Sequence, residues 1–245
     1  MSQKRKIFLS VFVVAALAAK IVAEFTHEIL GHGSLVLLFG GEITSIYISV
    51  LWPYDVSYIG WILPSDVTTA QLVLIYAGGI LACMFASFVT QTFLLLKKKV
   101  QWHYVVLFFW FAFWTLVNST GYLIIGGLSP FGDVNELIVL GVLTKFLSFA
   151  LGLIFFSIGF IGLSWILRKT LLEVFSAERA SLGVILFWLI LPALVMVMLA
   201  NPERNLQASY IPLTFIPTVL SLFIEYFLVL SKQKANKNPD NITKK

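Results

Sequence analysis

Long apolar stretches, separated by short polar ones, run along almost the whole chain. Six of these stretches reach the roughly 20 residues that a helix needs to cross a bilayer. They occupy residues 7–39, 67–96, 104–125, 137–167, 182–200 and 210–230. The first is too long for one perpendicular span. The pattern therefore predicts an all-α integral membrane protein with about six transmembrane helices.

The amino-acid composition excludes an ordinary soluble domain. Of 245 residues, 59% are hydrophobic and only 12% are charged, about half the charged share of soluble domains. A soluble fold of this length could not cover so much apolar surface. The net charge of +5 is modest and lies at the predicted membrane edges, so the expected partner is the lipid bilayer and not nucleic acid. The single cysteine, Cys83, excludes an intrachain disulfide and is expected to pack between helices.

Lysine and arginine residues mark one side of the predicted membrane protein. They cluster at 4–6, 97–99, 168–179 and 232–245, which flank alternate ends of the predicted helices. The connections 40–66 and 126–135 have none, and 201–209 has only Arg204. By the positive-inside rule, both termini of this multi-pass protein are expected in the cytoplasm, with the chain in the cell membrane. A competing interpretation of 4–19 as a cleaved signal peptide would leave the next helix too short to span.

One polytopic membrane domain is expected over residues 1–231, followed by a disordered cytoplasmic tail at 232–245, which is rich in Lys and Asn. The connection near 42–52 differs from the others. After Gly40 and Gly41 it carries β-branched and aromatic residues. This pattern predicts a short strand or hairpin, which is either re-entrant or an interfacial loop anchored by aromatic side chains.

A cluster of ionisable residues interrupts the first apolar stretch at His27-Glu28-Ile29-Leu30-Gly31-His32. Ionisable groups at membrane depth are costly and are functional candidates for that reason. Histidine is the commonest zinc ligand, and a glutamate beside a zinc-bound water is the usual general base of a metallopeptidase. The spacing H-E-x-x-x-H is one residue longer than the usual H-E-x-x-H pattern.

The longer spacing leaves two interpretations of this helix. Residues five apart lie about 140° apart around a regular α-helix, so His27 and His32 would not meet on one metal ion. A single-turn π-bulge would bring them together, and Gly31 makes such a distortion easier. In a regular helix, Glu24 and Glu28 would instead line up with His32, and the polar stripe would serve another purpose.

A catalytic zinc site needs a third protein ligand and one open position. The remaining histidine, His103, is expected at the opposite membrane edge. Asp133 lies in the short segment 129–136, on the same side as the end of the first helix and without a cationic partner. We expect its carboxyl group within about 6 Å of at least one motif imidazole, since Zn–O bonds measure about 2.0–2.2 Å. The alternative is that Asp133 or Asn135 caps the fourth helix.

Residues 27–48, HEILGHGSLVLLFGGEITSIYI, resemble the active-site helix and following strand of the site-2-protease class of intramembrane zinc metallopeptidases, the M50 clan. The second motif of that family is an aspartate after a proline-containing turn two spans later. Pro130-Phe131-Gly132-Asp133 matches it in kind and order. The resemblance covers about residues 20–136 and implies a catalytic core at about 7–136.

This resemblance implies a Zn²⁺ site held by His27, His32 and Asp133, with Glu28 as the general base. It also implies a transmembrane or membrane-anchored protein substrate. The H-E-x-x-G-H spacing itself is similar to the zinc motif of the dipeptidyl-peptidase III family, which is soluble and much larger, so the longer spacing is compatible with zinc. Members of the M50 clan typically hold zinc toward the cytoplasm, whereas the charge distribution here places the motif toward the opposite side.

Asn118 lies late in the third predicted helix, near the depth of the expected metal site. It is expected either to donate to a scissile carbonyl of the substrate or to hydrogen-bond a neighbouring helix. The competing hypothesis for the whole chain is a non-enzymatic membrane protein: a transporter, a metal carrier or an inactive protease relative. In that case the stripe Lys20-Glu24-Glu28-His32 would form an ion or proton path.

Overall fold

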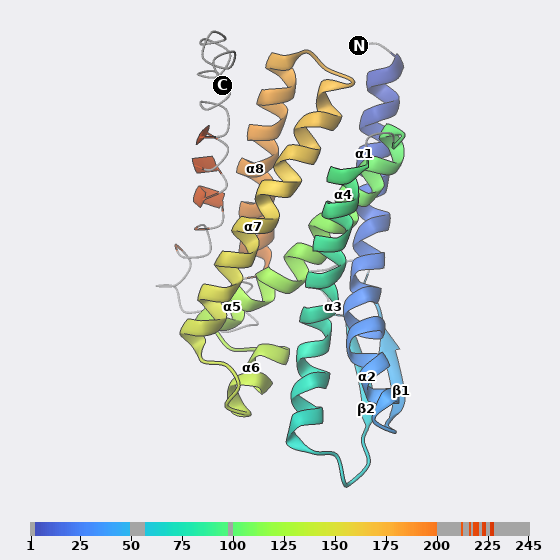
Figure 1. Ribbon diagram of the computed structural model, residues 1–245, viewed down its shortest axis with the longest axis vertical. Coiled ribbons are helices and arrows are strands. Elements are labelled where there is room, and N and C mark those ends of the chain that lie inside the picture. Colours follow the sequence, from blue (N-terminus) through green and yellow to red (C-terminus); the bar gives the residue numbers. More distant parts are fainter. Residues whose placement is uncertain are drawn as a thin grey trace, which may run out of the picture.

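The computed structural model describes residues 3–49, 57–97 and 100–199, and the scattered positions 212, 216, 218–220, 222–223 and 226–227. Three consecutive helices, α1 (Gln3–Phe25), η1 (Thr26–Gly33) and α2 (Ser34–Leu38), form one continuous rod. The other helices are α3 (Thr69–Leu96), α4 (Trp102–Leu116), η2 (Val117–Gly121), α5 (Tyr122–Leu128), α6 (Gly132–Val139), α7 (Lys145–Leu172) and α8 (Ala177–Leu199). Together they make an elongated bundle (Figure 1).

Four helical stretches within the described residues are long and apolar enough to cross a membrane. They are Gln3–Leu38, Thr69–Leu96, Trp102–Leu128 and Lys145–Leu172. The first three confirm the helices predicted at 7–39, 67–96 and 104–125, and the set agrees with a membrane protein. Helix α8 matches the fifth predicted stretch as a helix. The sixth, 210–230, falls mainly outside the described residues, so the structure supports an all-α membrane fold without establishing six spans.

The prediction of one continuous fourth helix at 137–167 is wrong. The structure has two helices in its place, α6 and α7, separated by a turn at 140–144. Gly141 adopts φ 76° in this turn, a left-handed conformation that suits glycine. The Thr144 side chain then accepts a backbone N–H hydrogen bond of 3.1 Å from the first turn of α7. Most residues of the turn are apolar, so the hydropathy pattern does not reveal it.

A small antiparallel hairpin follows the rod. Its strands are β1 (Glu42–Tyr47) and β2 (Tyr58–Ile62). The chain leaves α2 through Gly40, whose φ of 79° ends the helix. The strand predicted near 42–52 is thus confirmed over its described part, and residues 50–52 lie outside the described ones. The hairpin lies alongside α2 and the adjoining part of the rod (Figure 1).

Buried aromatic side chains hold the bundle together toward the end that carries the N-terminus. Phe8 of α1, Phe109 and Phe113 of α4, Phe160 of α7 and Trp188 of α8 are each no more than 2% exposed. The rings of Phe160 and Trp188 meet edge to face with centroids 4.3 Å apart, a geometry that adds about 0.5–1.5 kcal/mol beyond simple burial. This packed end supports the helices that carry the candidate site.

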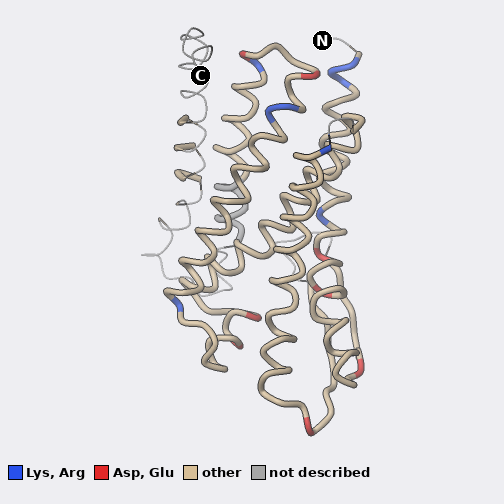
Figure 2. Tube along the Cα trace, viewed as in Figure 1, with Lys and Arg blue, Asp and Glu red and all other residues tan. Residues whose placement is uncertain are grey.

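Charged residues are distributed unevenly along the bundle. Figure 2 shows most of the described Lys and Arg near the end that carries the N-terminus, with others within α1 and at the start of α7. The one at the start of α7 is Lys145, which the break before α7 moves out of the helix interior to the opposite end. Asp66 lies exposed in the loop before α3 at that opposite end. The distribution agrees with the charge bias in the sequence, with Lys145 as an exception.

Candidate metal centre

The segment Thr26–Gly33 is π-helical, whereas α1 and α2 on either side are α-helical. Because π-helices form i→i+5 hydrogen bonds, residues five apart come to lie on the same side. The ring centroids of His27 and His32 are accordingly 4.9 Å apart, and both side chains are buried. The predicted bulge is confirmed, and the regular-helix interpretation of the motif is wrong.

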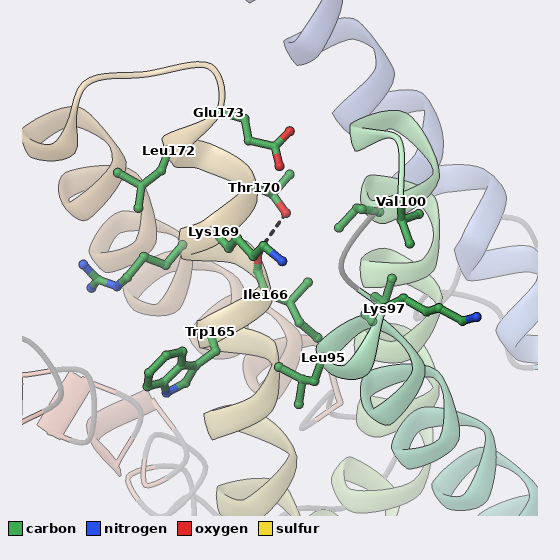
Figure 3. A pocket seen from close by; sticks show the side chains of 12 residues that line it. Leu95, Lys97, Val100, Trp165, Ile166, Lys169, Thr170, Leu172 and Glu173 are labelled. Carbon is green, nitrogen blue, oxygen red and sulfur yellow. Dashed lines mark hydrogen bonds between the residues drawn. The ribbon is translucent and has the colours of Figure 1, made fainter.

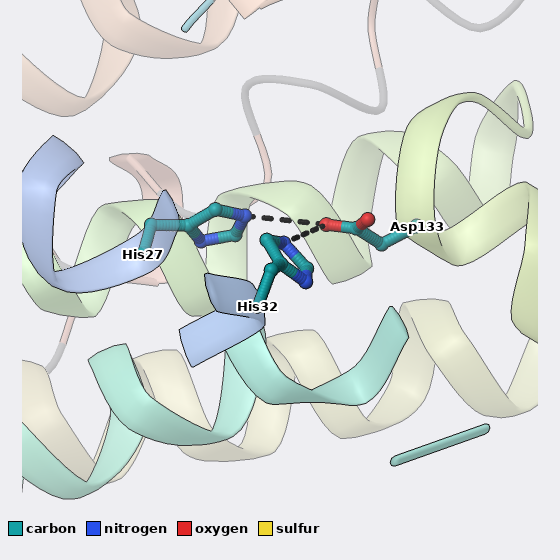
Figure 4. Close-up of side chains that lie close together, drawn as sticks. All are labelled: His27, His32 and Asp133. Atoms are coloured by element: carbon teal, nitrogen blue, oxygen red, sulfur yellow. Dashed lines mark hydrogen bonds and ion pairs between the residues drawn. The ribbon is translucent and has the colours of Figure 1, made fainter. Parts of the chain in front are cut away.

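Asp133 completes the cluster from the first turn of α6. Its Oδ2 lies 3.2 Å from Nε2 of His27 and 3.2 Å from Nε2 of His32, so the expected approach within about 6 Å is confirmed. Figure 4 shows the three side chains pointing toward one another. The capping alternative is wrong, because the N-cap residue of α6 is Phe131 and the amide of Asn135 donates to Glu136.

The environment of Asp133 favours its ionised form. Burial opposes ionisation, but the hydrogen bonds from His27 and His32 outweigh burial and hold the pKa of Asp133 below its ordinary value. A metal ligand must be deprotonated to bind, so this carboxylate is ready to coordinate across the physiological pH range.

The two distances from Asp133 to the imidazoles match the spacing of neighbouring ligands around a zinc ion. Zinc bonds of about 2.0–2.1 Å place neighbouring ligand atoms about 3.3 Å apart in a tetrahedron. Both measured His–Asp distances are 3.2 Å, and all three ligand atoms lie within 4.8 Å of one another. Nδ1 of His32 also donates to the backbone carbonyl oxygen of Ile75 at 2.7 Å, so Nε2 is the nitrogen that faces Asp133 and that would bind a metal after losing its proton.

Gly79 of α3 keeps the space beside the two imidazoles open. A Cβ atom at this position would lie 2.5 Å from Nε2 of both His27 and His32. At Gly31 in η1, a Cβ would lie 2.5 Å from Cα of Gly79, so the two helices touch through their backbones. Gly79 thus allows close packing of α3 against η1 and leaves space beside the two candidate ligand nitrogens.

Gly79→Ala is therefore expected to weaken zinc binding by about 10–100-fold, the range found when groups that support metal ligands are altered. The added methyl group must displace one imidazole from the cluster. Zinc content of the purified variant, titrated against a competing chelator, measures the effect. Gly183→Ala is the control, because a Cβ there meets the flexible end of Leu171 at 3.2 Å, far from the cluster. Equal zinc affinity of Gly79→Ala and wild type would contradict this role.

Other side chains complete the surroundings of the cluster. Glu28 is buried and interacts electrostatically with both imidazoles and with Asp133. The ring of Tyr122 lies 5.2 Å from that of His27, and the ring of Trp61 lies 5.9 Å from that of His32. Trp61 was expected only as one of the aromatic anchors of an interfacial loop, and no motif in the sequence pointed to Tyr122.

Nothing matches this chain among known protein families, curated proteins or solved structures.

Two polar residues singled out in the sequence lie away from the three ligand atoms. Asn118 is buried in η2, and its Nδ2 donates to Oε1 of Glu24 at 3.1 Å. His103 lies in the first turn of α4, near the end of the bundle that carries the N-terminus. Cys83 is fully buried, as expected, and its Sγ also lies 3.9 Å from Nδ1 of His27.

A cleft of about 430 Å³ lies near the end of the bundle that carries the N-terminus and is separate from the metal centre. It is lined by the end of α3, the start of α4 and the end of α7, including Leu95, Val105 and Ile166 (Figure 3). The metal cluster contacts the opposite half of α3, near Ile75 and Gly79. The cleft is therefore not a substrate pocket for that centre.

Proposed function

We propose that this protein is a membrane-embedded zinc metallopeptidase that hydrolyses a transmembrane or membrane-proximal peptide bond. One observation carries the proposal: two buried imidazoles and a carboxylate converge, and a buried glutamate is the chain neighbour of the first imidazole. Two histidines and one carboxylate are a frequent ligand set of catalytic zinc sites. The resemblance of residues 27–48 to the M50 clan supports the same chemistry.

In the proposed mechanism each residue has a distinct task. Zinc, when bound, acts as a Lewis acid that polarises the scissile carbonyl and lowers the pKa of a coordinated water toward 7. His27, His32 and Asp133 would hold the ion and leave one position open. The Glu28 carboxylate accepts the proton of the attacking water and delivers it to the amine nitrogen as the C–N bond breaks. Burial of this carboxylate keeps bulk water from competing for the proton.

The hairpin offers a means of presenting the substrate. A helical substrate holds its carbonyl groups in backbone hydrogen bonds and must be unwound locally before attack. Within the part of the chain that the structure describes, each strand of the two-stranded sheet has one edge that no other strand pairs with. An extended substrate segment would add to such an edge by main-chain hydrogen bonds, as in β-strand addition. The 43–50 segment, which contains most of β1, is the proposed platform.

The proposal is tested with purified protein in detergent or lipid nanodiscs. We expect about one zinc ion per chain and cleavage of a synthetic transmembrane peptide, which a zinc chelator abolishes and added zinc restores. Bound zinc follows from elemental analysis, and the products from mass spectrometry. Folded protein that binds no metal, or cleavage that is indifferent to the chelator, would overturn the proposal.

A transporter or metal carrier is the second candidate function. The observation that favours it is the buried ion pair of Lys20 and Glu24 in the same rod, at 3.8 Å. A path along Lys20, Glu24, Glu28 and His32 would need one continuous face, which the π-helical turn disrupts. Stoichiometric zinc without cleavage of any tested peptide would favour this candidate.

The charge distribution predicts that the loop before α3 faces away from the cytoplasm and that the chain end lies inside. Cysteines introduced as Asp66→Cys and Asp240→Cys should therefore react oppositely with a membrane-impermeant thiol reagent on intact cells. The first should be labelled and the second protected until the cells are permeabilised. Cys83 gives no background because it is fully buried. The reverse labelling pattern would restore the usual M50 orientation.

A further inference from the structure

Two ionisable residues that precede the metal motif have no task in the proposed chemistry. Lys20 is 6% exposed and Glu24 is 5% exposed, and both lie near the middle of the 36-residue rod Gln3–Leu38. Ionisable side chains at such depth are rare and are kept for a purpose. Nζ of Lys20 lies 3.8 Å from Oε1 of Glu24, so the two charges compensate each other. Each member of the pair also contacts a different part of the bundle.

Lys20 contacts the end of the hairpin that is formed by Ser49 and Ser57, which is called the hairpin tip below. Its Nζ donates to the backbone carbonyl oxygen of Ser49, just beyond β1, at 2.9 Å. The backbone N–H of Ser49 donates to Oγ of Ser57, just before β2, at 3.0 Å, and both serines are buried. The end of the hairpin at Ser49 and Ser57 therefore lies against the middle of the rod. Non-helical backbone at membrane depth needs internal partners, and Lys20 supplies one of them.

Glu24 contacts the second π-helical turn. Its Oε1 accepts a hydrogen bond of 3.1 Å from Nδ2 of Asn118. Every residue of this turn, Val117–Gly121, is buried. The next residue is Tyr122, whose ring lies 5.2 Å from the ring of His27. Glu24 thus holds the turn that brings an aromatic side chain onto the first proposed zinc ligand.

The other part of the hairpin lies directly on the metal motif. The ring of Trp61 in β2 is 5.9 Å from that of His32. The side chain of Ile59 is so close to Gly33 that a Cβ there would meet it at 3.1 Å. The hairpin is consequently held at two places. The strand β2 packs on the metal motif, and Lys20 binds the hairpin tip.

We propose that Lys20 and Glu24 are a positioning pair that fixes the hairpin and the second π turn relative to the metal centre. Lys20 anchors the hairpin tip, Glu24 anchors Asn118, and their mutual attraction joins the two anchors. The hairpin then keeps a constant distance from the cluster. Its use as a substrate platform rests on the proposed peptidase function, whereas the anchoring itself does not.

Lys20→Met is the direct test, because it keeps the length of the side chain and removes its charge and donor. Spin labels are placed at Ile46 in β1 and Leu81 in α3, which are 53% and 54% exposed. The distance between the two labels, measured by pulsed electron paramagnetic resonance, reports the position of the hairpin. We expect one narrow peak in the distribution of distances in the otherwise wild-type protein and loss of that peak in Lys20→Met. Lys145→Met is the matched control, since Lys145 is exposed at the start of α7.

The double variant Lys20→Met/Glu24→Gln separates positioning from stability. Lys20→Met alone leaves a buried carboxylate without its partner, which destabilises the fold. The double variant removes both charges, so we expect its thermal stability to return toward that of wild type while the narrow distance stays lost. If the pair served stability alone, the double variant would regain both the thermal stability and the narrow distance peak of the wild type.

Kinetics on the unlabelled variants adds the functional readout. Loss of positioning should raise KM about tenfold, with kcat changed much less and zinc content unchanged, as expected when substrate docking alone is weakened. Unchanged distances in Lys20→Met, or full recovery of the narrow distance in the double variant, overturn the positioning pair. If the wild-type protein cleaves no tested peptide, the peptidase proposal is overturned. The distance between the spin labels still shows in that case whether Lys20 and Glu24 position the hairpin.

Discussion

Glu28→Gln is expected to lower the rate of peptide cleavage by about 10²–10⁴-fold, the usual contribution of a general base. The amide keeps the shape of the side chain and most of its hydrogen bonding but cannot accept the proton of the attacking water. Zinc content and thermal stability should stay near those of wild type, because Glu28 is not one of the three converging ligands. Single-turnover cleavage of a synthetic transmembrane peptide, paired with elemental analysis, measures both quantities.

Glu178→Gln provides the matched control for this experiment. The same chemical change is made at an exposed residue at the start of α8, far from the metal cluster, and cleavage should not change. If Glu28→Gln cleaves like wild type, the general-base assignment is wrong. If Glu28→Gln loses its zinc completely, Glu28 is itself a ligand, and the assignment of His27, His32 and Asp133 as the ligand set is wrong.

His32→Ala is expected to abolish zinc binding and cleavage together. The substitution removes Nε2 from the cluster and also the 2.7 Å hydrogen bond from Nδ1 to the carbonyl oxygen of Ile75. The loss of zinc affinity should exceed the roughly 10–100-fold that follows when only a supporting group of a ligand is removed. Zinc titration and cleavage assays on one preparation would show whether the two losses coincide.

His103→Ala is the control for the loss of an imidazole. His103 lies in α4 away from the cluster, so the variant should keep its zinc and its cleavage rate. A His32→Ala variant that retains stoichiometric zinc would remove this histidine from the centre. A His32→Ala variant that loses zinc but still cleaves the peptide would show that cleavage does not require zinc.

The sequence was sufficient to predict the metal cluster because its chemistry leaves few alternatives. A mismatch of about 140° between His27 and His32 can be relieved only by a local change in helical pitch, and the structure contains that change. Asp133 followed from the shortage of other ligands on that side of the membrane. Both deductions depend on spacing and residue type, which are visible in a single sequence.

Other features depend on contacts between distant segments and could not be predicted in this way. The break at 140–144 is apolar, so hydropathy extends across it. The role of Gly79 appears only when α3 is packed against η1, because its importance lies in the space that it leaves beside the imidazoles. For Asn118 the sequence left two roles open, and the contact with Glu24 on the neighbouring rod selects the hydrogen bond between helices. In each case the missing information was tertiary.

The π-helical turn also implies a relation to shorter motifs. One additional residue in a helix normally rotates everything beyond it, but a π turn absorbs an insertion locally and leaves the flanking helices in register. Leu30 is a natural candidate for the inserted residue, because its side chain is 56% exposed whereas His27 and His32 are buried. Deleting it would turn the segment into His-Glu-Ile-Gly-His, the five-residue zinc motif of an ordinary α-helix. The π turn thus brings His27 and His32 together as the shorter spacing would in a regular helix, although the sequence does not contain the shorter pattern.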